Sequence, residues 1–120
     1  MSAELLDATF PVLTIKVSGT LTSEELAASQ RVAGELIKKM GTARLLIIVD
    51  DFQGMEKGGD WGDVSFQMEH DDFIERIAVV SEPQWKQSAM LFTGKGIRRV
   101  AIEHFLPAQI EEARAWVKAS

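Results

Sequence analysis

Hydrophobic positions along the chain follow two different periods, and the shorter period predicts the strands. Within residues 4–18, "VLTIKV" has an apolar residue at every second position, which is typical of a half-buried strand. Pro11 marks a break or hairpin turn that would divide this region into two strands. Five consecutive apolar residues in 44–50, "RLLIIVD", indicate a strand buried on both faces. Two further strands are predicted at 76–81 and 97–103.

The longer period predicts helices between these strands. Residues 22–40 carry apolar side chains at helical spacing and begin with a T-x-x-E sequence, which is typical of a capping box. Gly41 suits the left-handed position that ends such a helix. The remaining helices are predicted at 60–70, 81–92 and 106–119.

Alternation of strands and helices predicts an α/β layered fold. Right-handed crossovers would make the strands from residue 44 onward largely parallel, while the first hairpin-like pair would add an antiparallel edge. We therefore expect a single domain over residues 1–120, with a mixed, mostly parallel sheet of four to five strands and about four helices.

Composition limits the classes of function. The chain has 120 residues, no cysteine and a net charge of -5. Its length is sufficient for one hydrophobic core, and the absence of cysteine excludes disulfides and thiol chemistry. The acidic balance argues against a nucleic-acid partner, because phosphate contacts need a basic face. No apolar run approaches the length of a membrane span, and the first residues do not resemble a signal peptide. We therefore expect a cytoplasmic protein with no transmembrane segment.

Two carboxylates, Asp50 and Asp51, end the most hydrophobic strand. Ligands bind at the carboxyl ends of strands in α/β folds, so these acids are candidate general acid/base groups or Mg²⁺ ligands. Successive residues in a strand point in opposite directions, which favours a structural role instead. The glycines that follow do not match a phosphate-binding loop, since the lysine precedes Gly58 and Gly59 and neighbouring acids would repel phosphate.

Other polar candidates have weaker patterns. The two histidines, His70 and His104, are too few for a metal site on their own, and the sequence does not indicate that they converge. No serine lies in a G-x-S-x-G elbow, so a nucleophilic triad has no support.

Large apolar residues concentrate in the predicted second and third helices and the loops beside them. Three explanations stay open: the core, a pocket for an apolar ligand, and a self-association surface. The residues concerned are Met55, Trp61, Phe66, Met68, Phe73, Trp85, Met90 and Phe92.

The element order, together with several stretches, resembles the SpoIIAA-like family of small bacterial STAS-type domains. The stretches are "VDDFQGM" at the strand end, the tryptophan-bearing second helix leading to "HDDFIERIAVV", Trp85 early in the third helix, and the terminal "EEARAWV". The resemblance covers most of the chain. It implies a protein-interaction module rather than an enzyme, and the fold shared with CRAL-TRIO-type lipid-binding domains implies a possible apolar ligand.

One departure from the family pattern limits this inference. Anti-sigma-factor antagonists of the STAS type are switched by a phosphorylated serine before the second helix, but no serine or threonine occurs between Asp50 and Asp63. The phosphorylation switch therefore does not carry over.

We therefore expect a non-enzymatic binding module without a cofactor or metal. Its partner would be a protein, a second copy of the chain in a homodimer, or a small apolar, lipid-like ligand. The site would lie around the loop at 50–61 and the start of the third helix, with Asp51, Met55, Trp61 and Trp85 as contacts. The alternative is a small metal-dependent hydrolase or phosphotransfer protein that uses Asp50 and Asp51.

Overall fold

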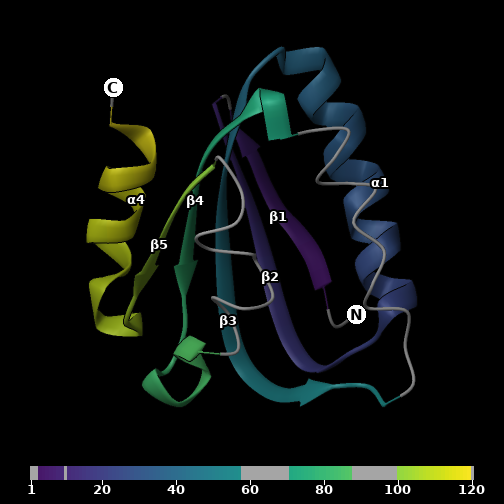
Figure 1. The fold of residues 1–120 in the computed structure, drawn as a ribbon, viewed down its shortest axis with the longest axis vertical. Helices are drawn as coiled ribbons and strands as arrows, with labels where there is room; N and C mark the ends of the chain where they lie inside the picture. The colour runs from purple at the N-terminus through teal and green to yellow at the C-terminus, as the bar shows by residue number, and fades with distance from the viewer. Residues whose placement is uncertain (1–2, 10, 58–70, 88–99, 120) are drawn as a thin grey trace.

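One five-stranded sheet organises the computed structural model, which describes residues 3–9, 11–57, 71–87 and 100–119 (Figure 1). The strands lie side by side in the order of the chain. β1 and β2 are antiparallel, and each later pair is parallel, which confirms the mixed, mostly parallel sheet. The strands are β1 (Ala3–Thr9), β2 (Val12–Leu21), β3 (Ala43–Met55), β4 (Ile74–Val80) and β5 (Ala101–Phe105).

Helix α1 (Ser23–Met40) begins and ends where the sequence predicts. The Thr22 hydroxyl oxygen accepts a hydrogen bond from the Glu25 N–H at 3.1 Å, which satisfies one of the unpaired donors of the first turn. At the other end Gly41 has a φ of +84°, a conformation that suits glycine, and its N–H bonds to the Ile37 carbonyl at 2.9 Å.

The two helices among the described residues cover opposite faces of the sheet (Figure 1). Alternate residues of β3 point to each face, so Leu45 packs in the cluster with Ile37 of α1, while Leu46 packs with Val117 of α4 (Ile110–Lys118). The prediction that this strand is buried on both faces is therefore confirmed. The run of consecutive apolar residues in β3 agrees with this packing, because a strand between two layers of helices has no face exposed to water.

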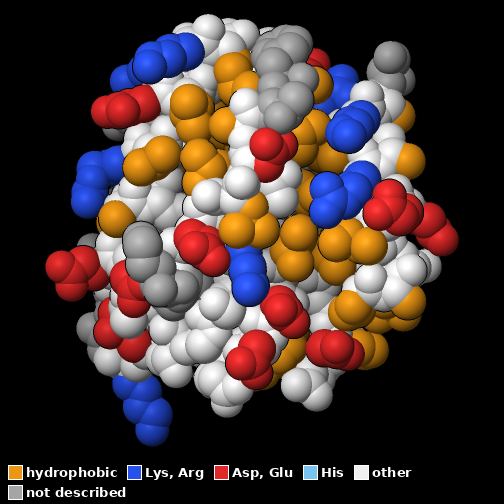
Figure 2. Space-filling view, turned by 180° about the vertical axis from the view of Figure 1, so that it is seen from behind, with side chains coloured by type: hydrophobic (Ala, Val, Ile, Leu, Met, Phe, Trp, Pro, Cys, Tyr) orange, Lys and Arg blue, Asp and Glu red, His pale blue; other side chains and the backbone are white. Residues whose placement is uncertain are grey.

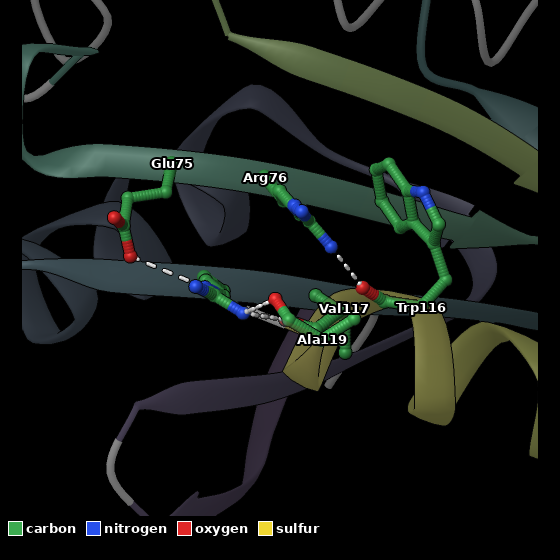
Figure 3. Close-up of polar contacts among 6 residues, drawn as sticks. Glu75, Arg76, Trp116, Val117 and Ala119 are labelled. Carbon is green, nitrogen blue, oxygen red and sulfur yellow. Dashed lines mark hydrogen bonds and ion pairs between the residues drawn. The ribbon is translucent and has the colours of Figure 1, made fainter.

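Two arginines fasten the last turn of α4 to the sheet. Arg76 of β4 donates a hydrogen bond to the Trp116 carbonyl at 2.6 Å, and its guanidinium carbon lies 5.3 Å from the centre of the Trp116 ring (Figure 3). Arg44 of β3 donates to the carbonyls of Val117 and Ala119 and pairs with Glu75 at 3.1 Å. These cations meet the unpaired carbonyls and negative end of the helix dipole.

The described residues contain two α-helices rather than the four or so predicted. The helix predicted at 60–70 lies outside the described residues, as does the 88–92 part of the helix predicted at 81–92. The described start of the latter is a 3-10 turn, η2 (Pro83–Trp85), followed by α-helical residues at 86–87, so the predicted helix is confirmed there. Another 3-10 turn, η1 (Asp71–Phe73), precedes β4.

Several predicted boundaries also differ, including that of β4, which is Ile74–Val80 instead of 76–81. The last strand is Ala101–Phe105 instead of 97–103, and residues 97–99 lie outside the description. The closing helix opens with a 3-10 turn, η3 (Pro107–Gln109), in which the Gln109 N–H bonds to the Leu106 carbonyl at 2.8 Å. The Gln109 side chain also accepts a hydrogen bond from the Leu106 N–H at 2.9 Å, and Pro107 occupies the first turn. Within the described ranges, no helix is long and apolar enough to cross a membrane.

Candidate functional site

The strand that ends in the paired acids is longer than its sequence pattern predicts. β3 runs to Met55, so Asp51 and Met55 lie in the strand with Asp50 rather than in a loop after it. β2 pairs with this extension, with Leu21 opposite Met55. The pairing shifts register after Val49, where Asp51 has a φ of +51°. Hydrogen bonds to β2 thus maintain the strand through a stretch of low strand propensity.

The two acids do not form a joint site. The Asp50 carboxylate lies 3.9 Å from the Lys16 ammonium of the neighbouring strand, and its side chain is largely exposed. The Asp51 carboxylate accepts a hydrogen bond from the Gln53 amide at 3.3 Å. Hard cations such as Mg²⁺ require several converging oxygen ligands. Across the described residues, no group of three or more potential His, Cys, Asp or Glu ligands is brought together.

Glu56 fastens the end of β3 to the start of α1. Its carboxylate accepts hydrogen bonds from the Ser23 N–H at 2.8 Å and the Ser23 hydroxyl at 3.0 Å, and its own N–H bonds to the Leu21 carbonyl at 2.8 Å. A carboxylate at a helix N-terminus is favoured by the helix dipole. Glu56 therefore positions the carboxyl end of β3, a role that its position in the sequence does not predict.

An aromatic contact joins the carboxyl end of β3 to the segment after β4. The rings of Phe52 and Trp85 meet edge to face, with centres 4.8 Å apart and planes at 73°. Both side chains are half-buried, and Met55, three residues further along β3, is 37% exposed. Of the predicted contacts, the structure thus brings Trp85 to the end of β3 through Phe52, which the sequence analysis did not single out. Trp61 lies outside the described residues.

A buried serine and a histidine meet at the carboxyl ends of β4 and β5. Ser81 directly follows β4 and is fully buried, and its hydroxyl oxygen lies 2.7 Å from Nε2 of His104 on β5. The Ser81 N–H also bonds to the Phe105 carbonyl at 3.1 Å. The sequence assigns His104 no partner, because the pairing depends on the register of two separate strands.

The surroundings of His104 favour its neutral form. Burial lowers the pKa of the imidazole below its usual value, and the charge of Lys86 lowers it further. A hydrogen bond with the Ser81 backbone opposes this effect in part by raising the pKa of His104. Because Ser81 is inaccessible to solvent, the pair lacks the access to a substrate that a nucleophilic serine requires.

Large exposed hydrophobic residues are dispersed over the described part of the chain. They lie on β1, α1, β3, η1 and the segment before η3, and they are Leu6, Val32, Met55, Phe73 and Leu106. On the face seen in Figure 2, hydrophobic side chains lie in several groups with acidic and basic side chains between them. Single exposed hydrophobic residues are normal on a protein surface, so this face does not by itself indicate an interface.

Comparisons with known proteins agree with this architecture. An uncharacterized protein of the DUF3478 family from Shewanella loihica PV-4, whose crystal structure has a SpoIIAA-like fold, superposes with a TM-score of 0.73 at 16% sequence identity. The match covers 97% of this chain and 93% of that one. A comparison with curated proteins found no match. The model of the SpoIIAA-like family matches residues 12–118, and the chain therefore belongs to the SpoIIAA-like family.

Proposed function

We propose that this protein is a non-enzymatic binding module that takes an apolar ligand at the carboxyl end of the parallel strands. The observation that carries the proposal is the edge-to-face pair of Phe52 and Trp85, half-buried at that end of the sheet. These two residues define what is called below the apolar contact surface. Aromatic rings provide large apolar contacts, which suit a ligand without strong directional groups.

The size and position of this surface favour a small ligand over a large protein partner. Ligands of α/β sheets bind at the carboxyl ends of the strands. A standard protein interface uses about 20–30 residues on each side. In the described part of the chain, the large exposed hydrophobic residues lie on separate helices, strands and turns. The rings of Phe52 and Trp85, in contrast, meet each other from two segments.

Titration with a fluorescent fatty acid tests the proposal. Trp85→Ala and Phe52→Ala should each weaken binding about tenfold, equivalent to ~1.4 kcal/mol. Val32→Ala is the matched control, because Val32 is an exposed hydrophobic residue on α1, 49% accessible and outside the apolar contact surface. Equal losses in all three variants would show that the probe binds nonspecifically and would contradict the proposal.

Two other outcomes identify a different partner. If the fatty acid does not bind, but light scattering gives a dimer that Trp85→Ala dissociates, the apolar contact surface serves self-association instead. A rise in melting temperature with millimolar Mg²⁺ or Mn²⁺, lost in Asp50→Asn, would support the metal-dependent alternative, because a ligand that binds only the folded state stabilises it. We expect neither, since Asp50 is paired with Lys16 and the two acids do not converge.

A further inference from the structure

We propose that Asp51 is a positioning residue, whose backbone conformation turns Phe52 onto the face of the sheet where it meets Trp85. This role rests on the proposed function in one respect: displacing Phe52 alters ligand binding only if the apolar contact surface is the binding site. It extends that function by assigning a part in it to one of the two acids that end the apolar run of β3.

The alternation of side chains along β3 is regular up to Asp50. Val49 packs against the cluster on the α1 face. The Asp50 carboxylate lies 3.9 Å from the ammonium of Lys16, whose partner Ile48 packs on the α4 face. Val49 and Asp50 therefore point to opposite faces, as successive strand residues do. If this alternation continued, Phe52 would point to the α4 face.

One extra residue in β3 changes the face that Phe52 occupies. On β2, Gly19 follows Val17 by two positions, whereas its partner Phe52 follows Val49 by three. Paired residues of neighbouring strands share a face, so Phe52 lies on the face of Val49 instead of the opposite one. An extra residue of this kind is a β-bulge, which redirects side chains and is frequent beside functional sites.

Trp85 approaches Phe52 from the same face. His104 pairs with Val79 of the α1-face cluster, and its Nε2 lies 2.7 Å from the Ser81 hydroxyl. Ser81 thus points to that face, and the 3-10 turn that ends at Trp85 begins two residues later. The ring centres of Trp85 and Phe52 are 4.8 Å apart. The bulge is therefore what allows the two rings to meet.

Asp51 supplies the backbone conformation at the bulge. Its φ is +51°, and no other non-glycine residue in the described ranges has a positive φ. Aspartate tolerates this conformation better than most residues because its short side chain bonds locally, and here it accepts from the Gln53 amide at 3.3 Å. Such conformations cluster at functional sites, where the surrounding structure holds them. Because Asp51 directly precedes Phe52, its conformation sets the direction of that ring.

The nuclear Overhauser effect between the ring protons of Phe52 and Trp85, measured by NMR on the whole protein, tests this role. Asp51→Val should lose the effect, because a β-branched residue disfavours a positive φ. Asp51→Gly should retain it, since glycine adopts a positive φ without strain. Asp50→Val is the matched control, because Asp50 is the neighbouring acid and does not have a positive φ, and it should also retain the effect.

A milder variant guards against misfolding of Asp51→Val. Asp51→Ala removes the local hydrogen bond and disfavours a positive φ without adding a branched side chain, so it should weaken the effect in part. Circular dichroism verifies that each variant is folded. If Asp51→Val and Asp51→Ala lowered stability but left the contact of the two rings unchanged, Asp51 would be structural only, and the positioning role would be overturned.

Binding of the fluorescent fatty acid separates this role from the proposed function. With both correct, Asp51→Val weakens binding about tenfold, as Phe52→Ala does, while Asp51→Gly and Asp50→Val bind like the wild type. If the contact responds to Asp51→Val but neither Phe52→Ala nor Asp51→Val changes affinity, the positioning role stands and the proposed function fails. If Phe52→Ala weakens binding but the contact persists in Asp51→Val, the function stands and the positioning role fails.

Discussion

At the scale of single residues, the polar side chains at the carboxyl end of the sheet are used for attachment. Glu56 is one of several acids in a stretch that could have held a cation, yet its carboxylate is occupied by the Ser23 N–H and hydroxyl. His104 could have been a ligand or a base, yet its Nε2 is directed at a buried serine. Both contacts join elements that are distant in the chain, and each has a measurable consequence for stability.

Replacing Glu56 should destabilise the junction of β3 and α1. Glu56→Ala leaves the Ser23 N–H and hydroxyl without their acceptor, and we expect a loss of about 1–2 kcal/mol in the free energy of unfolding, measured with urea. Glu56→Gln keeps an acceptor and should lose less. Glu24→Ala in the same turn of α1 is the control, because Glu24 is exposed. If Glu24→Ala lowered the free energy of unfolding by as much, Glu56 would act through its charge near the helix and not through its hydrogen bonds with Ser23.

Stability should depend on pH through His104. Its folded-state pKa is lowered by burial and by Lys86, so around and below pH 6.5 the unfolded chain binds more protons than the folded one. The contribution of His104 is therefore complete above about pH 6.5 and is lost as the pH falls through the folded-state pKa. Urea denaturation of the wild type and His104→Asn at several pH values measures this. The slope of stability with pH should be smaller in the variant over that window.

At the scale of elements, β3 shows how pairing overrides local propensity. Its first half, "RLLIIVD", is predictable because five apolar residues need burial on both faces. Its second half is not, since Asp51 and Gly54 have positive φ and neither favours a strand. Hydrogen bonds from β2, which itself continues to Leu21, extend the strand there. The sequence carries no local signal for such pairing between distant segments.

Helix α4 depends on the sheet for its last turn. Arg76→Met keeps an apolar stem but removes the hydrogen bond to the Trp116 carbonyl and the contact with the Trp116 ring. We expect a loss of about 1–3 kcal/mol, with faster amide exchange concentrated in α4. Arg31→Met on the exposed face of α1 is the control and should change little. Exchange that accelerates equally in α1 would argue that Arg76 stabilises the whole fold instead.

At the scale of the whole molecule, the layered fold can be predicted from the sequence, because the buried faces of strands and helices require hydrophobic residues at regular spacing. The order of strands and helices and the antiparallel edge can be predicted from this pattern, whereas the family resemblance also rests on particular stretches such as "VDDFQGM" and "EEARAWV". The contacts of the candidate site are not marked by any such sequence pattern. Phe52 meets Trp85, and Ser81 meets His104, only because parallel strands of different segments end at the same edge. Such coincidences depend on register, which a single sequence does not encode locally.

The two hydrophobic clusters on opposite faces of the sheet should respond independently to mutation. Ile77 belongs to the α1 face, while Val80 and Val117 belong to the α4 face. Ile77→Val should cost about 0.5–1.5 kcal/mol, and its effect should add to that of Val117→Ala within about 0.5 kcal/mol. Val80→Ala and Val117→Ala share one cluster, so their combined effect should depart from the sum by more than this.

Urea denaturation of the single and double variants measures both cycles. Coupling across the sheet as strong as coupling within the α4 face would show that β3 and β4 transmit packing changes from one layer to the other. Loosening of α4 would then reach the α1 face, where His104 lies, and the two ends of the sheet could not be treated as separate. Additivity across the sheet instead supports two cores that share strands but pack separately, so that the carboxyl-end contacts can change while the attachment of α4 remains intact.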